Sequence, residues 1–326
     1  MGFFDEQVGV KVPQVTVYFW VIKVLATTVG ETFADFLNGN VGLGLGGTSG
    51  TMLAILLVAL AAQLKLDFYF PPLYWFVIVA ISTVGTLLSD NLTDNLGVSL
   101  SVTTPIFLSL LGVVFLAWYH SEKNLSIHSI FTRRREAWYW LTVLVTFALG
   151  TSAGDLTAEK LDVGYGNSLV LFAGCILFVG LLWRFKVING VLGFWVVYVL
   201  TRPLGASLGD LMSQNPADSV ASASSSGSGS SSASASASAS ESMSGSGETE
   251  ELPSGWKTGL NLGTTVTSMI FLALIAVLVA FLTITKKDEL KVESIHPDLE
   301  KGEAAEATST TSVQHEWTTL PDNAAR

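Results

Sequence analysis

Three ionisable side chains stand inside the first apolar run of the sequence. Lys23, Glu31 and Asp35 lie in FWVIKVLATTVGETFAD, which is long enough to cross a membrane. A charge near the bilayer centre costs at least about 2.5–3.5 kcal/mol on insertion scales unless it is paired or hydrated. Steps of four residues, with Thr27 between Lys23 and Glu31, place these side chains along one face of a helix. We therefore expect Lys23 and Glu31 to face a bundle interior, either as a structural ion pair or on a polar pathway.

The aspartate belongs to a pattern that occurs four times. In each copy a tryptophan is followed ten residues later by a glycine and five residues after that by an aspartate. The copies are Trp20, Gly30 and Asp35; Trp75, Gly85 and Asp90; Trp140, Gly150 and Asp155; and Trp195, Gly205 and Asp210. They start 55, 65 and 55 residues apart, which indicates a two-repeat half that was itself duplicated. We expect the glycines to mark close helix contacts, and the tryptophans to pack between helices or anchor the membrane interface.

The four aspartates fall near the outer ends of equivalent helices. If the repeats surround a common axis, Asp35, Asp90, Asp155 and Asp210 form a ring of carboxylates that concentrates cations. Alternatively, each aspartate lies in the headgroup region and caps the next helix.

A basic residue interrupts the fourth repeat in VVYVLTRPLGASLGDL. Arg202 is expected to pair with Glu31, Asp35 or Asp210. Pro203 lacks an amide donor and crowds the preceding turn, so we expect it to kink or break the helix at Thr201–Arg202.

Composition fixes the class of fold. The chain is 49% hydrophobic and 13% charged, whereas soluble domains carry about 25% charged residues. We expect an all-α polytopic membrane protein with eight transmembrane helices in four parallel two-helix repeats. The first helices are expected at 15–37, 71–92, 137–156 and 187–210, and the second helices at 43–65, 97–119, 164–184 and 257–284.

The loops predict orientation and organisation. Basic residues concentrate at both termini and in the even-numbered loops, so both termini are expected in the cytoplasm. The expected segments are a cytoplasmic N-terminus (1–14), a first membrane half (15–119), a basic cytoplasmic loop (120–136), a second half (137–285) interrupted by a disordered Ser/Ala/Gly-rich loop (212–256), and a disordered cytoplasmic tail (286–326).

Several chemistries are disfavoured. The four histidines lie outside the apolar runs and there is one cysteine, so no soft-metal site is indicated within the bundle. Gly154-Asp155 and Gly209-Asp210 resemble part of an intramembrane protease motif, but Ser152 and Ser207 replace its first glycine. No phosphate-binding loop, nucleophile elbow or nucleic-acid surface is present. We therefore expect neither an enzyme nor a cofactor.

The segments KVPQVTVYFWVIKVLATTVGETFADFL, ALGTSAGDLTAEKL and VLTRPLGASLGDL resemble a bacterial membrane-protein family of unknown function. That family consists of four tandem two-helix repeats, each with a tryptophan. The resemblance covers roughly 11–211 and 256–285, while the serine-rich insert and the acidic tail depart from it. It implies the architecture and leaves the mechanism open.

These observations predict a transporter or channel for a small cation, with the lipid bilayer and that cation as partners and no nucleic acid. The expected acidic pathway residues are Glu31, Asp35, Asp90, Asp155 and Asp210. Lys23 and Arg202 are expected to act as gating or counter-charge partners. The alternative is a non-transporting scaffold or sensor in which the same charges lock the helices together. The sequence assigns no metal, transport direction or oligomeric state.

Overall fold

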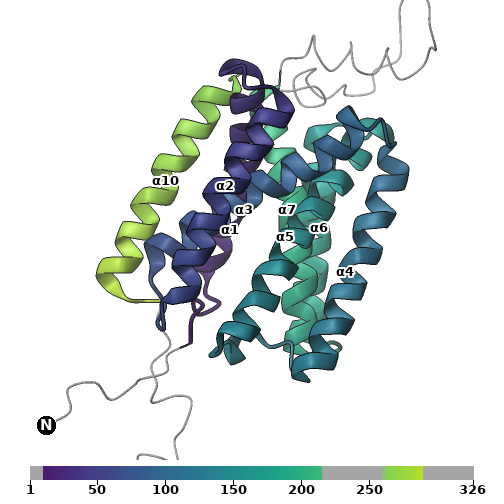
Figure 1. Cartoon of the computed structure of the whole chain (residues 1–326). Coiled ribbons are helices and arrows are strands. Elements are labelled where there is room, and N and C mark those ends of the chain that lie inside the picture. The colour runs from purple at the N-terminus through teal and green to yellow at the C-terminus, as the bar shows by residue number, and fades with distance from the viewer. Residues whose placement is uncertain (1–9, 215–259, 261, 289–326) are drawn as a thin grey trace, which may run out of the picture.

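The computed structural model describes residues 10–214, 260 and 262–288 (Figure 1). Its long helices are α1 (Val17–Asp35), α2 (Gly44–Lys65), α3 (Pro71–Asp90), α4 (Leu100–Glu122), α5 (Arg133–Asp155), α6 (Tyr165–Arg184), α7 (Gly190–Ser213) and α10 (Thr264–Thr285). All eight are long and apolar enough to cross a membrane, so the chain is a multi-pass membrane protein. The expected disordered insert (212–256) and tail (286–326) lie almost wholly outside the described residues.

Four of these helices form an inner ring. α1 packs against α3, α3 against α5, α5 against α7, and α7 against α1. Half or more of each of these spans is buried, between 50% and 72%, whereas α2, α4, α6 and α10 are 17–33% buried. The first helix of every repeat is therefore an inner helix, and the second is an outer helix.

Each outer helix packs on the inner helix of the following repeat. α2 packs on α3, α4 on α5, and α6 on α7. The last outer helix, α10, packs on α1 and so closes the circle; in Figure 1 it lies beside the N-terminal helices. The repeats are thus joined cyclically.

The repeated glycines explain how closely the inner helices approach. At each one, an added Cβ would collide with the residue three positions before the glycine of the next repeat. The collisions are Gly30 with Ser82 Oγ at 2.0 Å, Gly85 with Phe147 Cβ at 2.7 Å, Gly150 with Arg202 Cγ at 2.2 Å, and Gly205 with Thr27 Oγ1 at 2.0 Å. The prediction that these glycines mark close contacts is confirmed, and the contacts follow one another around the ring.

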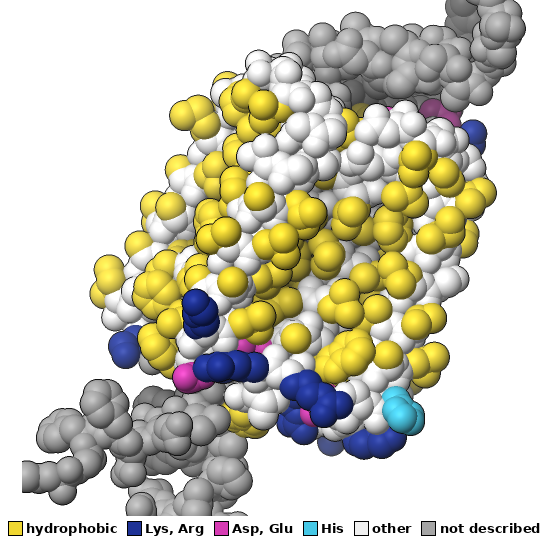
Figure 2. Space-filling view, viewed as in Figure 1, with side chains coloured by type: hydrophobic (Ala, Val, Ile, Leu, Met, Phe, Trp, Pro, Cys, Tyr) yellow, Lys and Arg dark blue, Asp and Glu magenta, His cyan; other side chains and the backbone are white. Residues whose placement is uncertain are grey.

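The two ends of the ring differ in charge. We call the end at Arg133, Arg134 and Arg135, where α5 begins, the basic end, and the end at the four repeated aspartates the acidic end. Lys and Arg gather at one end of the molecule in Figure 2, while apolar side chains spread over its side. Large apolar residues such as Leu116 are exposed there, as expected of a surface that faces lipid.

Two helices begin more than three residues from the expected position. α5 begins at Arg133 instead of 137, because the Thr132 hydroxyl accepts a hydrogen bond from the Arg135 amide and starts the helix within the expected loop. α10 begins at Thr264 instead of 257. Turns of wider helix extend three inner helices at the acidic end: η1 (Phe36–Asn40), η2 (Asn91–Asn95) and η4 (Leu156–Lys160). A short turn, η3 (Ile127–Ser129), lies between α4 and α5.

The expected break at Pro203 is wrong, because α7 continues through this residue to Ser213. The missing amide of Pro203 leaves the Val199 carbonyl without its intrahelical donor. Side chains of α1 donate to two other carbonyls of the same turn: Lys23 to that of Tyr198 and Thr27 to that of Thr201. Polar groups of a neighbouring helix beside such a turn help membrane helices to tolerate proline.

Candidate functional site

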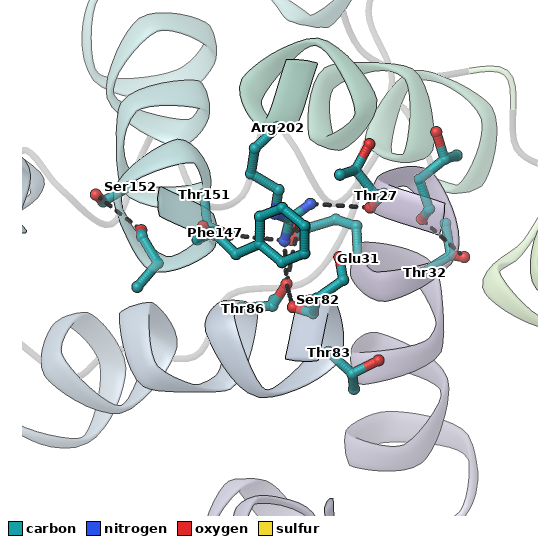
Figure 3. A network of polar contacts seen from close by, with 12 residues as sticks. Thr27, Glu31, Thr32, Ser82, Thr83, Thr86, Phe147, Thr151, Ser152 and Arg202 are labelled. Atoms are coloured by element: carbon teal, nitrogen blue, oxygen red, sulfur yellow. Dashed lines mark hydrogen bonds and ion pairs between the residues drawn. The ribbon is translucent and has the colours of Figure 1, made fainter. Parts of the chain in front are cut away.

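The centre of the inner ring holds one buried arginine. The residue directly after each repeated glycine is Glu31, Thr86, Thr151 or Ala206. Arg202 comes from the fourth repeat, and its Nη2 atom lies 2.7 Å from both Glu31 Oε2 and Thr151 Oγ1. The same nitrogen also donates to the Thr86 hydroxyl. One guanidinium thus contacts the equivalent residues of the other three repeats (Figure 3).

Two further hydrogen bonds complete this central cluster. Arg202 Nη1 donates to the Thr27 carbonyl at 2.9 Å, and the Thr86 hydroxyl donates to Glu31 Oε2 at 3.2 Å. Arg202 is fully buried and Glu31 is 6% exposed. Of the three acids considered for Arg202, the structure selects Glu31. Removing one partner of a buried pair costs about 3–5 kcal/mol, because an uncompensated charge remains.

The four repeated aspartates form a closed ring at the acidic end. Electrostatic interactions run from Asp35 to Asp90, from Asp90 to Asp155, from Asp155 to Asp210, and from Asp210 back to Asp35. Each aspartate also interacts with Glu31, which lies four residues before Asp35 on α1. The structure therefore brings the four predicted aspartates to one end of the ring, with Glu31 one helical turn closer to its centre.

The carboxylates of Asp35, Asp90 and Asp155 form no capping hydrogen bond with the turns that follow them. These residues directly precede η1, η2 and η4. The capping interpretation is therefore wrong for these three residues. Among the described residues, no hydrogen bond or ion pair to the side-chain carboxylate of any of the four aspartates is present. No group of three carboxylate, histidine or cysteine side chains in the described ranges could hold a metal ion.

Lys23 lies two helical turns from Glu31, on the side of the basic end, and is fully buried. Its ammonium donates to the Tyr198 carbonyl at 3.0 Å and to the Thr201 hydroxyl. The nitrogen stands 3.8 Å from the ring centroid of Tyr198 and 4.9 Å from that of Phe147. The ion pair between Lys23 and Glu31 is not formed, and no acid within the described residues pairs with Lys23.

An aromatic layer separates Lys23 from the basic end. Trp75, Trp140 and Trp195 are at most 4% exposed and pack between helices, whereas Trp20 is partly buried. Tyr74 and Tyr139 precede two of them, and their hydroxyls hydrogen-bond to each other. In three of the four repeats the tryptophan therefore belongs to a packed layer across the ring.

A second buried ion pair, which sequence reasoning missed, lies at the basic end. Lys11 Nζ lies 3.1 Å from Glu136 Oε2, and Gln63 donates to Glu136 Oε1 at 3.1 Å. Glu136 is fully buried and Lys11 is 2% exposed. The sequence does contain a signal for this pair, because Glu136 departs from the repeat pattern. It stands four residues before Trp140, where the other repeats have Thr16, Pro71 and Val191. Glu31 departs from the repeat pattern in the same way.

Four segments of the chain match one family model, described as "Repeat of Unknown Function (DUF347)". The matched segments are residues 18–69, 73–124, 138–187 and 193–240. The fourth match ends before α10, because the insert separates this outer helix from α7. No curated protein matches the chain significantly, and no solved structure does. The four matches span more than half of the sequence, and the chain belongs to this family of tandem membrane repeats.

Proposed function

We propose that the protein is a transporter or channel that carries a small cation along the axis of the inner helix ring. The observation that supports this most is the position of Glu31. It joins Arg202 at the centre of the ring, through contacts supplied by all four repeats, and it lies next to four aspartates that pair with no other described residue. Buried charges inside membrane spans typically mark such pathways.

The arrangement supports a sequence of events. The aspartate ring concentrates cations at the acidic end, since nearby carboxylates of one sign focus the local field. A cation that reaches Glu31 competes with Arg202 for the same carboxylate oxygen. Release of Arg202 from Glu31 opens the centre of the ring, and its return closes it. Lys23 places a second positive charge beyond this point and limits passage to one cation at a time.

The proposed pathway runs between an outward-facing acidic end and a cytoplasmic basic end. By the positive-inside rule, the arginines at the start of α5 favour an orientation with the basic end in the cytoplasm. The aspartate ring then faces outward, and the described end of α10 and the start of α1 face the cytoplasm.

One observation favours the alternative of a non-transporting scaffold or sensor. The central cluster is closed. Arg202, in the fourth repeat, is fully buried and forms hydrogen bonds with residues of the other three repeats. A static lock between helices has the same geometry. The two proposals differ in whether Glu31 and Arg202 separate during function.

Cation flux in proteoliposomes tests the proposal. Protons, sodium, manganese and calcium are compared for the wild type, Glu31→Gln and Asp35→Asn. Asp162→Asn is the matched control, since it removes an exposed carboxylate at the same end of the molecule. We expect flux of one cation that is lost in folded Glu31→Gln, reduced in Asp35→Asn and unchanged in the control. Absence of flux for every cation would contradict transport and favour the scaffold.

A further inference from the structure

An open groove lies on the lipid-facing side of the molecule, where α2 packs on α3. It has a volume of about 510 Å³ and is lined only by apolar side chains. Five of them belong to α2, from Ala54 to Ala62, and two, Leu73 and Phe76, belong to the first turns of α3. Phe76 is 52% exposed, so the groove opens toward the surrounding bilayer and not toward the centre of the ring.

The groove has the depth of one lipid leaflet. From Ala54 to Lys65, the last residue of α2, the helix rises about 16 Å. Half of a bilayer's hydrocarbon core is about 15 Å thick. Because α2 ends and α3 begins at the basic end, where Asp67 contacts Arg133, the groove runs from near the middle of the membrane to the interface at that end. A single acyl chain of that leaflet has a matching length.

Small side chains of α2 make room for the groove. The second repeat is offset from the first by 55 residues, and the third by 120. By these offsets Ala59, which lines the groove, corresponds to Val114 of α4 and Val179 of α6. All three residues are at most 9% exposed, so they occupy the same register on their helices. The first repeat therefore leaves space that larger side chains take up in the second and third.

A basic side chain stands at the interfacial end of the groove. Lys65 follows Val58, a lining residue, by two helical turns, so the two side chains lie on the same face of α2. Lys65 is exposed, and within the described residues its ammonium forms no ion pair or hydrogen bond. The nearby acid, Asp67, lies 3.4 Å from Arg133 and 3.7 Å from Lys11. Lys65 thus keeps an uncompensated positive charge at the membrane interface.

This charge is as particular to the first repeat as the space is. By the same offsets Lys65 corresponds to His120 in the second repeat and Phe185 in the third, neither of which is a lysine or an arginine. An apolar groove of one leaflet's depth that ends at an unpaired ammonium complements a molecule with a long apolar chain and an anionic head.

We propose that this groove binds one anionic phospholipid of the leaflet at the basic end, with an acyl chain between α2 and α3 and the phosphate beside Lys65. Basic sites between transmembrane helices at the cytoplasmic side bind the head groups of such lipids. The apolar lining holds the chain, and the ammonium distinguishes an anionic head group from a zwitterionic one. Lipid binding here is independent of the proposed cation pathway, because it uses neither Glu31 nor the aspartate ring.

Native mass spectrometry of the purified protein tests the proposal, because it counts bound lipids and subunits in one measurement. The protein in detergent is mixed with equal amounts of phosphatidylglycerol and phosphatidylcholine that carry the same acyl chains. We expect one bound lipid that persists at low lipid concentration and prefers phosphatidylglycerol by about fivefold, as one lysine near the membrane surface provides. Lys65→Gln should abolish this preference, whereas Ala62→Leu should fill the groove and displace both lipids.

Lys186→Gln and Ala61→Leu are the matched controls. Lys186 is an exposed lysine just after α6, at the same end of the molecule. Ala61 is exposed beside Ala62 on α2 but does not line the groove. Both variants should bind lipid as the wild type does.

Three results would overturn the proposal. The first is equal binding of the two lipids by the wild type, or a preference that survives in Lys65→Gln. The second is a bound lipid that Ala62→Leu retains. The third is a dimer that Ala62→Leu dissociates, since a second copy of the chain would then fill the groove. Because Lys65 is exposed, the comparison of the wild type with Lys65→Gln decides even if Ala62→Leu fails to fold.

Discussion

Gly150 receives the side chain of Arg202 at the crossing of α5 and α7, where an added Cβ would lie 2.2 Å from Arg202 Cγ. The stem of the arginine is held against a backbone that offers no side chain, and its guanidinium reaches across to Glu31. The equivalent crossings elsewhere accept Ser82, Phe147 and Thr27. At three of the four crossings, the contact with the repeated glycine thus only packs two inner helices together. At the fourth crossing, the same contact also positions the central charge, that of Arg202.

Gly150→Ala is expected to destabilise the protein by about 1–3 kcal/mol, the usual cost of overpacking. The added methyl group meets both Arg202 and Pro203, neither of which has free space. Unfolding in detergent, followed by denaturant titration, measures the change. Gly174→Ala on the outer helix α6 is the control, because nothing lies within 4 Å of its added Cβ. Equal effects of the two substitutions would contradict the close crossing.

Arg202 and Glu31 are expected to be coupled in stability. Arg202→Gln and Glu31→Gln each leave a buried partner unpaired and should cost about 3–5 kcal/mol. The double variant should lose less than the sum of the two, by about 0.5–3 kcal/mol, because no unpaired charge remains. A double-mutant cycle from unfolding titrations measures this. Simple additivity would mean that the pair makes no net interaction.

Arg202→Lys is not expected to replace the arginine. A single ammonium cannot reproduce the planar fork that reaches Glu31, Thr151 and the Thr27 carbonyl together. The variant should keep the charge yet lose both stability and cation flux relative to the wild type. Full recovery of both would show that charge alone is required at this position.

The aspartate ring is expected to be destabilising at neutral pH. Asp35, Asp90, Asp155 and Asp210 repel one another and Glu31, and no described cation forms an ion pair with them. Asp90→Asn should therefore leave the melting temperature unchanged or raise it, and reduce flux. Asp162→Asn, at an exposed loop position, controls for the loss of a surface charge. A clear fall in melting temperature for Asp90→Asn alone would indicate a structural role.

Glu136→Gln is expected to loosen the segment at residues 10–16. Lys11 would lose its buried partner, and this segment is otherwise held by backbone hydrogen bonds from Lys11 to Ile130 and from Gln14 to Asp288. Hydrogen exchange at these amides should rise by one to several orders of magnitude, about tenfold per 1.4 kcal/mol. Asp67→Asn is the control, since Asp67 also lies near Lys11 but is 76% exposed. Its loss should cost less than about 1 kcal/mol.

Local patterns in the sequence were sufficient for the helices and the repeats. The spacing of Trp20, Gly30 and Asp35, repeated three more times, predicted four equivalent helices and, if these surround a common axis, a ring of aspartates. Hydropathy predicted the eight spans, and departures from the repeat at Lys23 and Glu31 singled out residues that are indeed buried. Such signals are local, because helix formation and membrane insertion depend on neighbours along the chain.

Only the tertiary structure decided which residues meet. Each outer helix packs on the next repeat, Arg202 pairs with Glu31 at a separation of 171 residues, and Lys23 contacts Tyr198 instead of an acid. The same holds for Lys11 and Glu136, 125 residues apart. The rotation and height of each helix in the ring select these partners, and close packing at the glycine crossings sets both. Since that packing joins segments from all four repeats, no single stretch of sequence specifies it.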